Sequence, residues 1–255
     1  MKALLARLIL VAAALAGAQN AAFAAPDVVV RESADPAKGA VTGQRVAIYV
    51  DVLFRDLMAH PPRVEIPDVT GAQIFRFETQ GSTMRETIDA ASYVGQRFEF
   101  AFYARRAGDF TVPPAEVTLL DREDAATGNA KGAALTIGVA TPPGVIASEP
   151  IVATESMKLE QSWSPDPKGP HKPGDAIVRT LIRTAEDVPA LAFADPPLDS
   201  PEGVRAYAAP PEAQDSVNRG ALTGKRIDRI TYVFEQAGAY RLPAFRQPWW
   251  DLAQH

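Results

Sequence analysis

One strand pattern occurs twice in this chain and limits what the chain can fold into. Each copy has a run of alternating residues, then Ala-Gly, an aromatic residue, one spacer, an aliphatic residue and Pro, and ends in two bulky apolar residues and Asp. The copies span residues 97–121 and 228–251. Matched positions, 130 residues apart, include Gly108 with Gly238, Pro113 with Pro243 and Asp121 with Asp251. A repeat of this length predicts two similar domains in tandem.

The alternation within each copy predicts β-structure. Phe98, Phe100 and Phe102 recur at every second position, which places the three rings on one face of a strand. Gly108 can adopt a positive φ, so the chain can reverse there. We therefore expect residues 110–112 to return as the antiparallel partner of the first strand, and we expect the second copy to form the same hairpin.

The rest of the chain favours short strands over helices. It contains 22 Pro, about twice the usual ~5 %, with turn signals every ~8–12 residues and no amphipathic helix. The prediction is all-β, with two tandem antiparallel β-sandwich domains of immunoglobulin-like type at residues 25–140 and 151–255. Residues 141–150 hold three Pro and one Gly, typical of a semi-rigid linker. The polar stretches 123–132 and 210–218 are expected to be loops.

The N-terminus has the features of an export signal. Lys2 and Arg7 form a positive region, residues 8–18 are apolar but too few to span a bilayer, and residues 22–24 fit the small-x-small cleavage rule. We expect residues 1–24 to be a cleavable signal peptide and the mature protein to be periplasmic. An uncleaved anchor is the alternative.

Composition excludes several classes of protein. The formal charge of −5 becomes −7 without Lys2 and Arg7, so nucleic acid and anionic lipid are poor partners. Without Cys there is no thiol catalysis, redox exchange or Cys-based metal site. No later apolar run approaches ~20 residues, so we expect no membrane span after the signal segment.

The sequence offers no catalytic machinery, and we expect neither an enzyme nor a cofactor. The histidines, which lack metal-ligand spacing, are His60, His171 and His255. No Gly-x-Ser-x-Gly elbow is present. The acidic cluster of Asp121, Glu123 and Asp124 supplies three carboxylates, fewer oxygen ligands than the six to eight of Ca²⁺. A solvated loop is expected there, with Ca²⁺ as the alternative, and no metal site is assigned.

Trp249 and Trp250 are the first candidate for partner binding. Successive strand residues point to opposite faces, so one ring can enter the core while the other faces outward. The corresponding residues of the first copy are Leu119 and Leu120, which suits core and inter-domain packing. The alternative is an exposed docking anchor, because Trp is enriched in binding hot spots.

Two basic pairs are weaker candidates. Arg105-Arg106 and Lys225-Arg226 are expected at strand ends facing solvent. Contact with an acidic partner is the alternative, and we retain Arg105 and Arg106 as possible partner-binding residues.

A series of motifs resembles a known family. In the second copy these are Gln161-Ser162-Trp163-Ser164, Pro173-Gly174-Asp175, Pro201-Glu202-Gly203-Val204 with Tyr207, residues 237–243 and Trp249-Trp250-Asp251. In the first copy they are Pro67, Gly71-Ala72 and residues 107–114. The series resembles the BatD (oxygen tolerance, aerotolerance) family over most of residues 26–251, and the terminal Trp-Trp-Asp is its most specific part.

The resemblance implies immunoglobulin-like periplasmic modules in a membrane-associated assembly linked to stress tolerance. Family members are encoded beside von Willebrand A-domain proteins and a MoxR-type ATPase, and no enzymatic activity is established for them. They usually continue past the Trp-Trp-Asp to a membrane-spanning helix, whereas this sequence stops at His255. A soluble short form and a truncated reading both stay open, as does tethering to the inner membrane.

Two functions are therefore expected from this sequence. The first is a non-enzymatic scaffold of a Bat-type complex, with von Willebrand A-domain membrane proteins as partners. The alternative is a secreted glycan-binding or pilus-chaperone-like module, for which exposed Tyr207, Trp163, Trp249 and Trp250 would have to share one surface.

Overall fold

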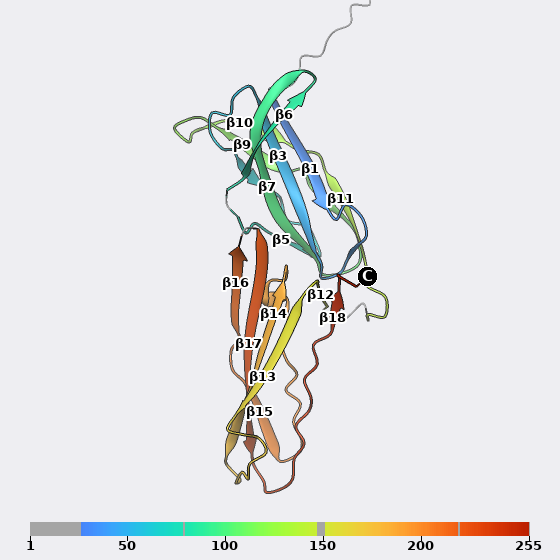
Figure 1. Ribbon diagram of the computed structural model, residues 1–255, viewed down its shortest axis with the longest axis vertical. Coiled ribbons are helices and arrows are strands. Elements are labelled where there is room, and N and C mark those ends of the chain that lie inside the picture. Colours follow the sequence, from blue (N-terminus) through green and yellow to red (C-terminus); the bar gives the residue numbers. More distant parts are fainter. Residues whose placement is uncertain (1–26, 79, 147–150, 219, 255) are drawn as a thin grey trace, which may run out of the picture.

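The chain forms two groups of β-strands, and every described strand pairs within its own group (Figure 1). The computed structural model describes residues 27–78, 80–146, 151–218 and 220–254. We call the group within residues 27–140 module 1 and the group within residues 151–254 module 2. The predicted signal peptide lies outside the described residues, as do residues 147–150 of the predicted linker.

The strands are short to medium in length. Module 1 contains β1 (Val28–Asp35), β2 (Ala40–Val41), β3 (Arg45–Arg55), β4 (Arg63–Glu65), β5 (Ala72–Phe75), β6 (Ser82–Ile88), β7 (Ala91–Ala104), β8 (Gly108–Val112), β9 (Glu116–Leu120), β10 (Ala126–Lys131) and β11 (Leu135–Ala140). Module 2 contains β12 (Val152–Thr154), β13 (Met157–Ser164), β14 (Ala176–Glu186), the 3-10 turn η1 (Ala190–Ala192), β15 (Val204–Ala208), β16 (Glu212–Asn218), β17 (Ala221–Phe234) and β18 (Trp249–Asp251).

The predicted all-β fold is confirmed. Neighbouring strands are antiparallel except for β2 with β11 and β12 with β18, which are parallel. Two stretches predicted as loops are strands instead, namely β10 and β16. Both are polar edge strands, and all seven residues of β16 are exposed. A strand exposed on both faces shows no apolar alternation, which is the pattern that identifies strands in a sequence.

The repeat in the sequence is also a repeat in strand order. The large sheet of module 1 runs β1-β3-β7-β5, with β6 also on β7. The large sheet of module 2 runs β13-β14-β17-β15, with β16 also on β17. Phe98 of β7 and Asp228 of β17 occupy equivalent positions, because they are 130 residues apart, the offset of the repeat. Phe98 pairs with Val50 in the middle of β3, and Asp228 pairs with Leu181 in the middle of β14.

Module 1 closes its large sheet with a second layer of strands. Phe98, Phe100 and Phe102 lie on one buried face of β7, as predicted. The facing layer consists of two three-stranded sheets, β10-β9-β4 and β2-β11-β8, whose apolar side chains join the same core. The rings of Phe102 and Phe110 meet edge to face with centroids 5.5 Å apart.

The predicted hairpins are wrong in both copies. In module 1 the strand β8 pairs with β11, so the chain crosses after β7 into the facing layer. Alternation shows which residues of a strand face the core. It does not show whether the next strand lies beside the first in the same sheet or opposite it in the facing layer. In module 2, residues 235–248 form no strand at all, and an extended segment leads to β18.

That extended segment is the cover of module 2. It runs along the inner face of the large sheet from its far end to β18 (Figure 1). Tyr240, Leu242 and Phe245 pack from it onto a core that includes Ile230 and Tyr232 of β17. The inner face is therefore covered by this segment and, over its charged side chains, by residues 193–195, where module 1 uses two sheets.

The inner face of module 2 also carries a buried ionic cluster. Asp228 accepts hydrogen bonds from Arg183 Nη2 at 2.6 Å and from Arg226 Nε at 3.0 Å. Arg226 also donates to the carbonyl of Phe193 at 2.6 Å and pairs with Asp195. Arg183, Arg226 and Asp228 are at most 5 % exposed. Burial lowers the pKa of Arg183 while Asp228 raises it, and the arginine stays charged.

Asp228→Ala should destabilise module 2 by about 3–5 kcal/mol, because the change leaves two buried arginines without their shared carboxylate. All three Trp lie in module 2, so urea unfolding followed by Trp fluorescence measures this module. The control is Glu212→Ala, which removes an exposed partner of Arg229 and should cost at most about 1 kcal/mol. Equal losses for the two variants would contradict a structural role of the cluster.

Candidate functional site: the junction between the modules

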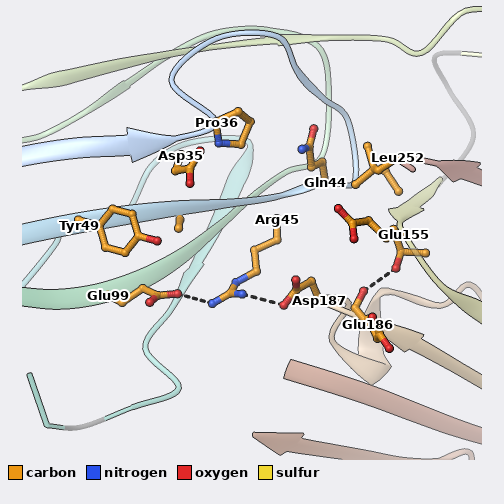
Figure 2. A pocket seen from close by; sticks show the side chains of 13 residues that line it. Asp35, Pro36, Gln44, Arg45, Tyr49, Glu99, Glu155, Glu186, Asp187 and Leu252 are labelled. Atoms are coloured by element: carbon orange, nitrogen blue, oxygen red, sulfur yellow. Dashed lines mark hydrogen bonds and ion pairs between the residues drawn. The ribbon is translucent and has the colours of Figure 1, made fainter. Parts of the chain in front are cut away.

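The two modules meet around a cavity of about 290 Å³. Its wall is made by Asp35, Pro36, Gln44, Arg45, Ala47, Tyr49 and Glu99 of module 1 and by Ala153, Thr154, Glu155, Glu186, Asp187 and Leu252 of module 2 (Figure 2). Five carboxyl groups surround one guanidinium, so the cavity favours cationic groups over anions. No set of three potential ligands among the described residues could hold a metal ion.

Arg45 is the main polar link across this junction. It lies at the start of β3 and donates from Nη1 to Asp187 Oδ1 of module 2 at 2.7 Å. Its Nη2 donates to Glu99 Oε1 of module 1 at 2.5 Å, so one guanidinium holds carboxylates of both modules (Figure 2). The arginine side chain is only 16 % exposed, but those of Asp187 and Glu99 are 48 % and 36 % exposed, so solvent screens the carboxylate end of each pair.

Besides the ion pair of its side chain with Arg45, two backbone hydrogen bonds hold Asp187 in place. Its backbone N–H donates to the carbonyl of Leu222 at 2.8 Å, and its own carbonyl accepts from the hydroxyl of Tyr103 at 3.1 Å. The residue has a φ of 55°, a conformation that Asp tolerates better than most residues. Asp187 is thus fixed by its own module and by module 1.

An apolar contact lies beside the ion pair. Ala101 and Tyr103, on the outer face of β7, pack with Leu222 of module 2, and Phe75 and Phe77 flank them. The opposite side of the junction requires a glycine at position 43, because a Cβ there would lie 2.2 Å from the carbonyl oxygen of Ile151. Both faces of β7 are therefore buried near this end, one by its own core and one by module 2.

Burial shifts the titration of the junction residues. It raises the pKa of the Tyr49 phenol, with nearby Glu99 and Asp35 adding to the shift, and it raises the pKa of Tyr103. Burial is also the largest cause of the raised pKa of Glu99, which Arg45 opposes. Both phenols therefore stay protonated at neutral pH, so they are hydrogen-bond donors and cannot act as bases.

The candidate Trp pair lies at the edge of this junction. β18 pairs with β12, which aligns Trp249 with Val152 and Trp250 with Ala153. Trp249 is 37 % exposed and Trp250 is half-buried. Their role in partner binding stays a prediction.

The candidate basic residues belong to module 1, whereas the Trp pair belongs to module 2. Arg105 and Arg106 are exposed in the turn between β7 and β8. The guanidinium of Arg106 lies over the ring of Phe110, 4.9 Å from its centroid. The role of Arg105 and Arg106 in partner binding also stays a prediction.

Sequence reasoning missed the buried charges of module 2. The pair Lys225-Arg226 was expected at an exposed strand end, but Arg226 lies in the middle of β17 and is buried. A signal was present, because Arg179 and Arg183 share the parity of Ile177 and Leu181 in β14. Arginines on the core parity of a central strand indicate a buried polar network.

The remaining polar candidates have structural partners. The Asp121 side chain accepts from the backbone N–H groups of Glu123 and Ala125, and Asp124 pairs with Arg63 at 2.7 Å. His171 stacks on Phe234 with centroids 5.3 Å apart. These contacts stabilise turns and a core edge.

The exposed aromatic residues do not gather on one surface. Tyr207 of β15, 49 % exposed, lies at the far end of module 2, and Trp249 lies at the junction end (Figure 1). Trp163 packs inward on Tyr232, with centroids 5.9 Å apart. This arrangement does not favour a flat aromatic platform for a glycan.

Comparison with known proteins gives little about function. No family model and no curated protein matches the chain. Among solved structures, it is similar to the type II cohesin dyad from the adaptor ScaA scaffoldin of Acetivibrio cellulolyticus, at 8 % identity over 83 % of this chain and 86 % of that chain, with a TM-score of 0.25. At that TM-score the likeness carries no argument. Within the described residues, no helix has the length and apolar character needed to cross a membrane.

Arg45→Gln should loosen the junction, because it removes the charge-assisted hydrogen bond to Asp187 of module 2, which is worth roughly 1 kcal/mol since the carboxylate is 48 % exposed. Spin labels on Leu57→Cys and Tyr207→Cys, both exposed in a chain without native Cys, report the distance between the modules. The distance distribution should broaden in the Arg45→Gln variant. It should not change for Arg31→Gln, which breaks an ion pair within module 1. An unchanged distribution for Arg45→Gln would show that Arg45 does not hold the junction.

Glu99→Gln should gain stability relative to the wild type as the pH rises. The folded-state pKa of Glu99 is raised above its ordinary 4.5, so the folded chain binds this proton more tightly and loses stability as the pH rises from 4.5 through the folded-state pKa. Glutamine does not titrate, so the Glu99→Gln variant does not have this loss of stability. Unfolding free energies of both proteins at pH 4 and pH 7 test this. If the variant loses relative stability over this range, the attraction of Arg45 outweighs the burial of Glu99.

Proposed function

We propose that this chain is an exported, non-enzymatic interaction protein resembling BatD, acting as the periplasmic scaffold of a Bat-type envelope complex linked to oxidative or other stress tolerance. The observation that carries the proposal is the ordered motif series over residues 26–251, which ends in Trp249-Trp250-Asp251. The partners would be von Willebrand A-domain membrane proteins, as the resemblance implies.

The junction supports a scaffold role on physical grounds. An ion pair, a tyrosine hydroxyl and an apolar contact hold the two modules in one orientation. A partner that touches both modules then meets a surface that loses little conformational entropy on binding. The junction supplies phenols that stay protonated and paired carboxylates, which suits recognition better than bond-breaking chemistry.

Trp249 is the residue we expect to contribute most to partner binding. It is exposed on a short strand anchored by the buried residues Val152 and Ala153. A large ring held on a rigid element is typical of binding hot spots. The strand that carries it, β18, lies at the junction end of module 2, next to module 1 (Figure 1).

Affinity capture with the tagged full chain from native membranes should recover a von Willebrand A-domain membrane protein. Trp249→Ala should lower the recovery by roughly tenfold, the effect of losing one hot-spot side chain. Tyr207→Ala, which removes a still more exposed aromatic side chain at the far end of module 2, should leave recovery unchanged. Failure to recover any such protein from membranes that contain one would count against the Bat-type role.

A further inference from the structure

The cover of module 2 has an unpaired backbone. In module 1 the equivalent stretch, β8, is bonded along its length to β11. In module 2 the offset of 130 residues maps β8 onto residues 238–242, which belong to no sheet. Among the described residues, no backbone-to-backbone hydrogen bond involves 236–248. The carbonyls of Gln236 and Pro243 accept hydrogen bonds from the side chains of Tyr240 and Arg179, whereas the N–H and C=O groups of residues 238–242 between them are available for a further strand.

Because module 2 has no counterpart of β11 among its described strands, its side chains at this place are less buried than those of module 1. β11 brings Ile137 and Val139 into the core of module 1, and Phe110 and Val112 of β8 are fully buried there. Their counterparts in module 2, Tyr240 and Leu242, are only half-buried.

The same opening reaches the edge strand β13. Leu159 of β13 is the equivalent of Val30 of β1. Leu159 pairs with Arg183 of β14, and Val30 pairs with Val52, the corresponding residue of β3. Val30 packs against the core of module 1, whereas Leu159 is 42 % exposed. The inner face of module 2 is therefore open on the side that β10 and β11 close in module 1.

A cavity marks the space that a strand would fill. It has a volume of about 510 Å³ and lies between the loop at residues 167–171, Phe234 and the stretch from Gly238 to Leu242. Arg241 and Arg246 are exposed on the same segment. The opening is thus apolar toward the core and positively charged toward solvent.

We propose that residues 238–242 accept an extended strand from a partner polypeptide, which adds antiparallel to this segment and completes the second layer of module 2. β11 is the template for the chemistry of that strand. Its inward residues are aliphatic, as Leu135, Ile137 and Val139 are. Its outward residues are polar or acidic, because they face Arg241 and Arg246. Backbone pairing supplies affinity and the alternate side chains supply specificity, as in other strand additions.

The occupant is a partner and not a second copy of this chain. β11, the one described strand with the required aliphatic alternation at this place in the fold, is already bonded on both sides by β2 and β8. The inference does not depend on the Bat-type role, because it rests on the comparison of the two modules alone.

A synthetic peptide of residues 133–141, which contain β11, is the probe. Added to the full chain, it should slow hydrogen exchange of the amides of residues 239–242 by at least about tenfold. The amides of β8, already paired, should not change. A peptide with Ile137→Asp should have no effect, because it places a charge in the core. A peptide with Thr136→Glu should bind more tightly, and Arg241→Glu in the protein should abolish that gain.

Three results would overturn the proposal. In the first, the amides of residues 239–242 exchange as slowly as those of β8 in the free chain, so that no opening exists. In the second, millimolar peptide leaves their exchange unchanged. In the third, sedimentation shows a concentration-dependent dimer that protects these amides, which assigns the opening to a second copy.

Discussion

The need to bury the inner face of the repeated five-stranded sheet determines how each module is built. A sheet with one apolar face must bury it against a second layer. Module 1 does so with two small sheets, whereas module 2 uses an extended segment and the loop at residues 193–195. The residues on the two inner faces differ accordingly, with Phe98 in β7 where Asp228 stands in β17. A thinly covered face tolerates charges, provided that they are paired and hydrogen-bonded.

The sequence was sufficient for the fold class, the repeat and the core parity. Period-two alternation identified β7 and its three phenylalanines, because one face of that strand is buried and the other was polar enough to show the pattern. It failed for β16, which is exposed on both faces, and for β10, whose inward residues Gly128 and Ala130 are small and only partly buried. It also failed for the strand after Gly108, because alternation does not distinguish a neighbour in the same sheet from a strand across the core.

The junction was beyond sequence reasoning for a related cause. Arg45 and Asp187 are 142 residues apart, and neither lies in a motif. Tyr103 sits on the polar parity of β7, and its burial comes from the other module. Arg226 was misread because a charged pair usually marks solvent exposure. Only the parity of Arg179 and Arg183 within β14 hinted that this module buries guanidinium groups.

The extended segment of module 2 also provides a mechanical path. It begins at the far tip of the module, runs the length of the sheet and continues directly into β18 at the junction (Figure 1). Among the described residues, no backbone-to-backbone hydrogen bond holds 236–248, and the segment is fastened to the sheet by side chains such as Arg179, which donates to the carbonyl of Pro243 at 3.0 Å. A pulling force applied at the far tip of module 2 is therefore transmitted along the covalent chain of this segment to Trp249 and the neighbouring module.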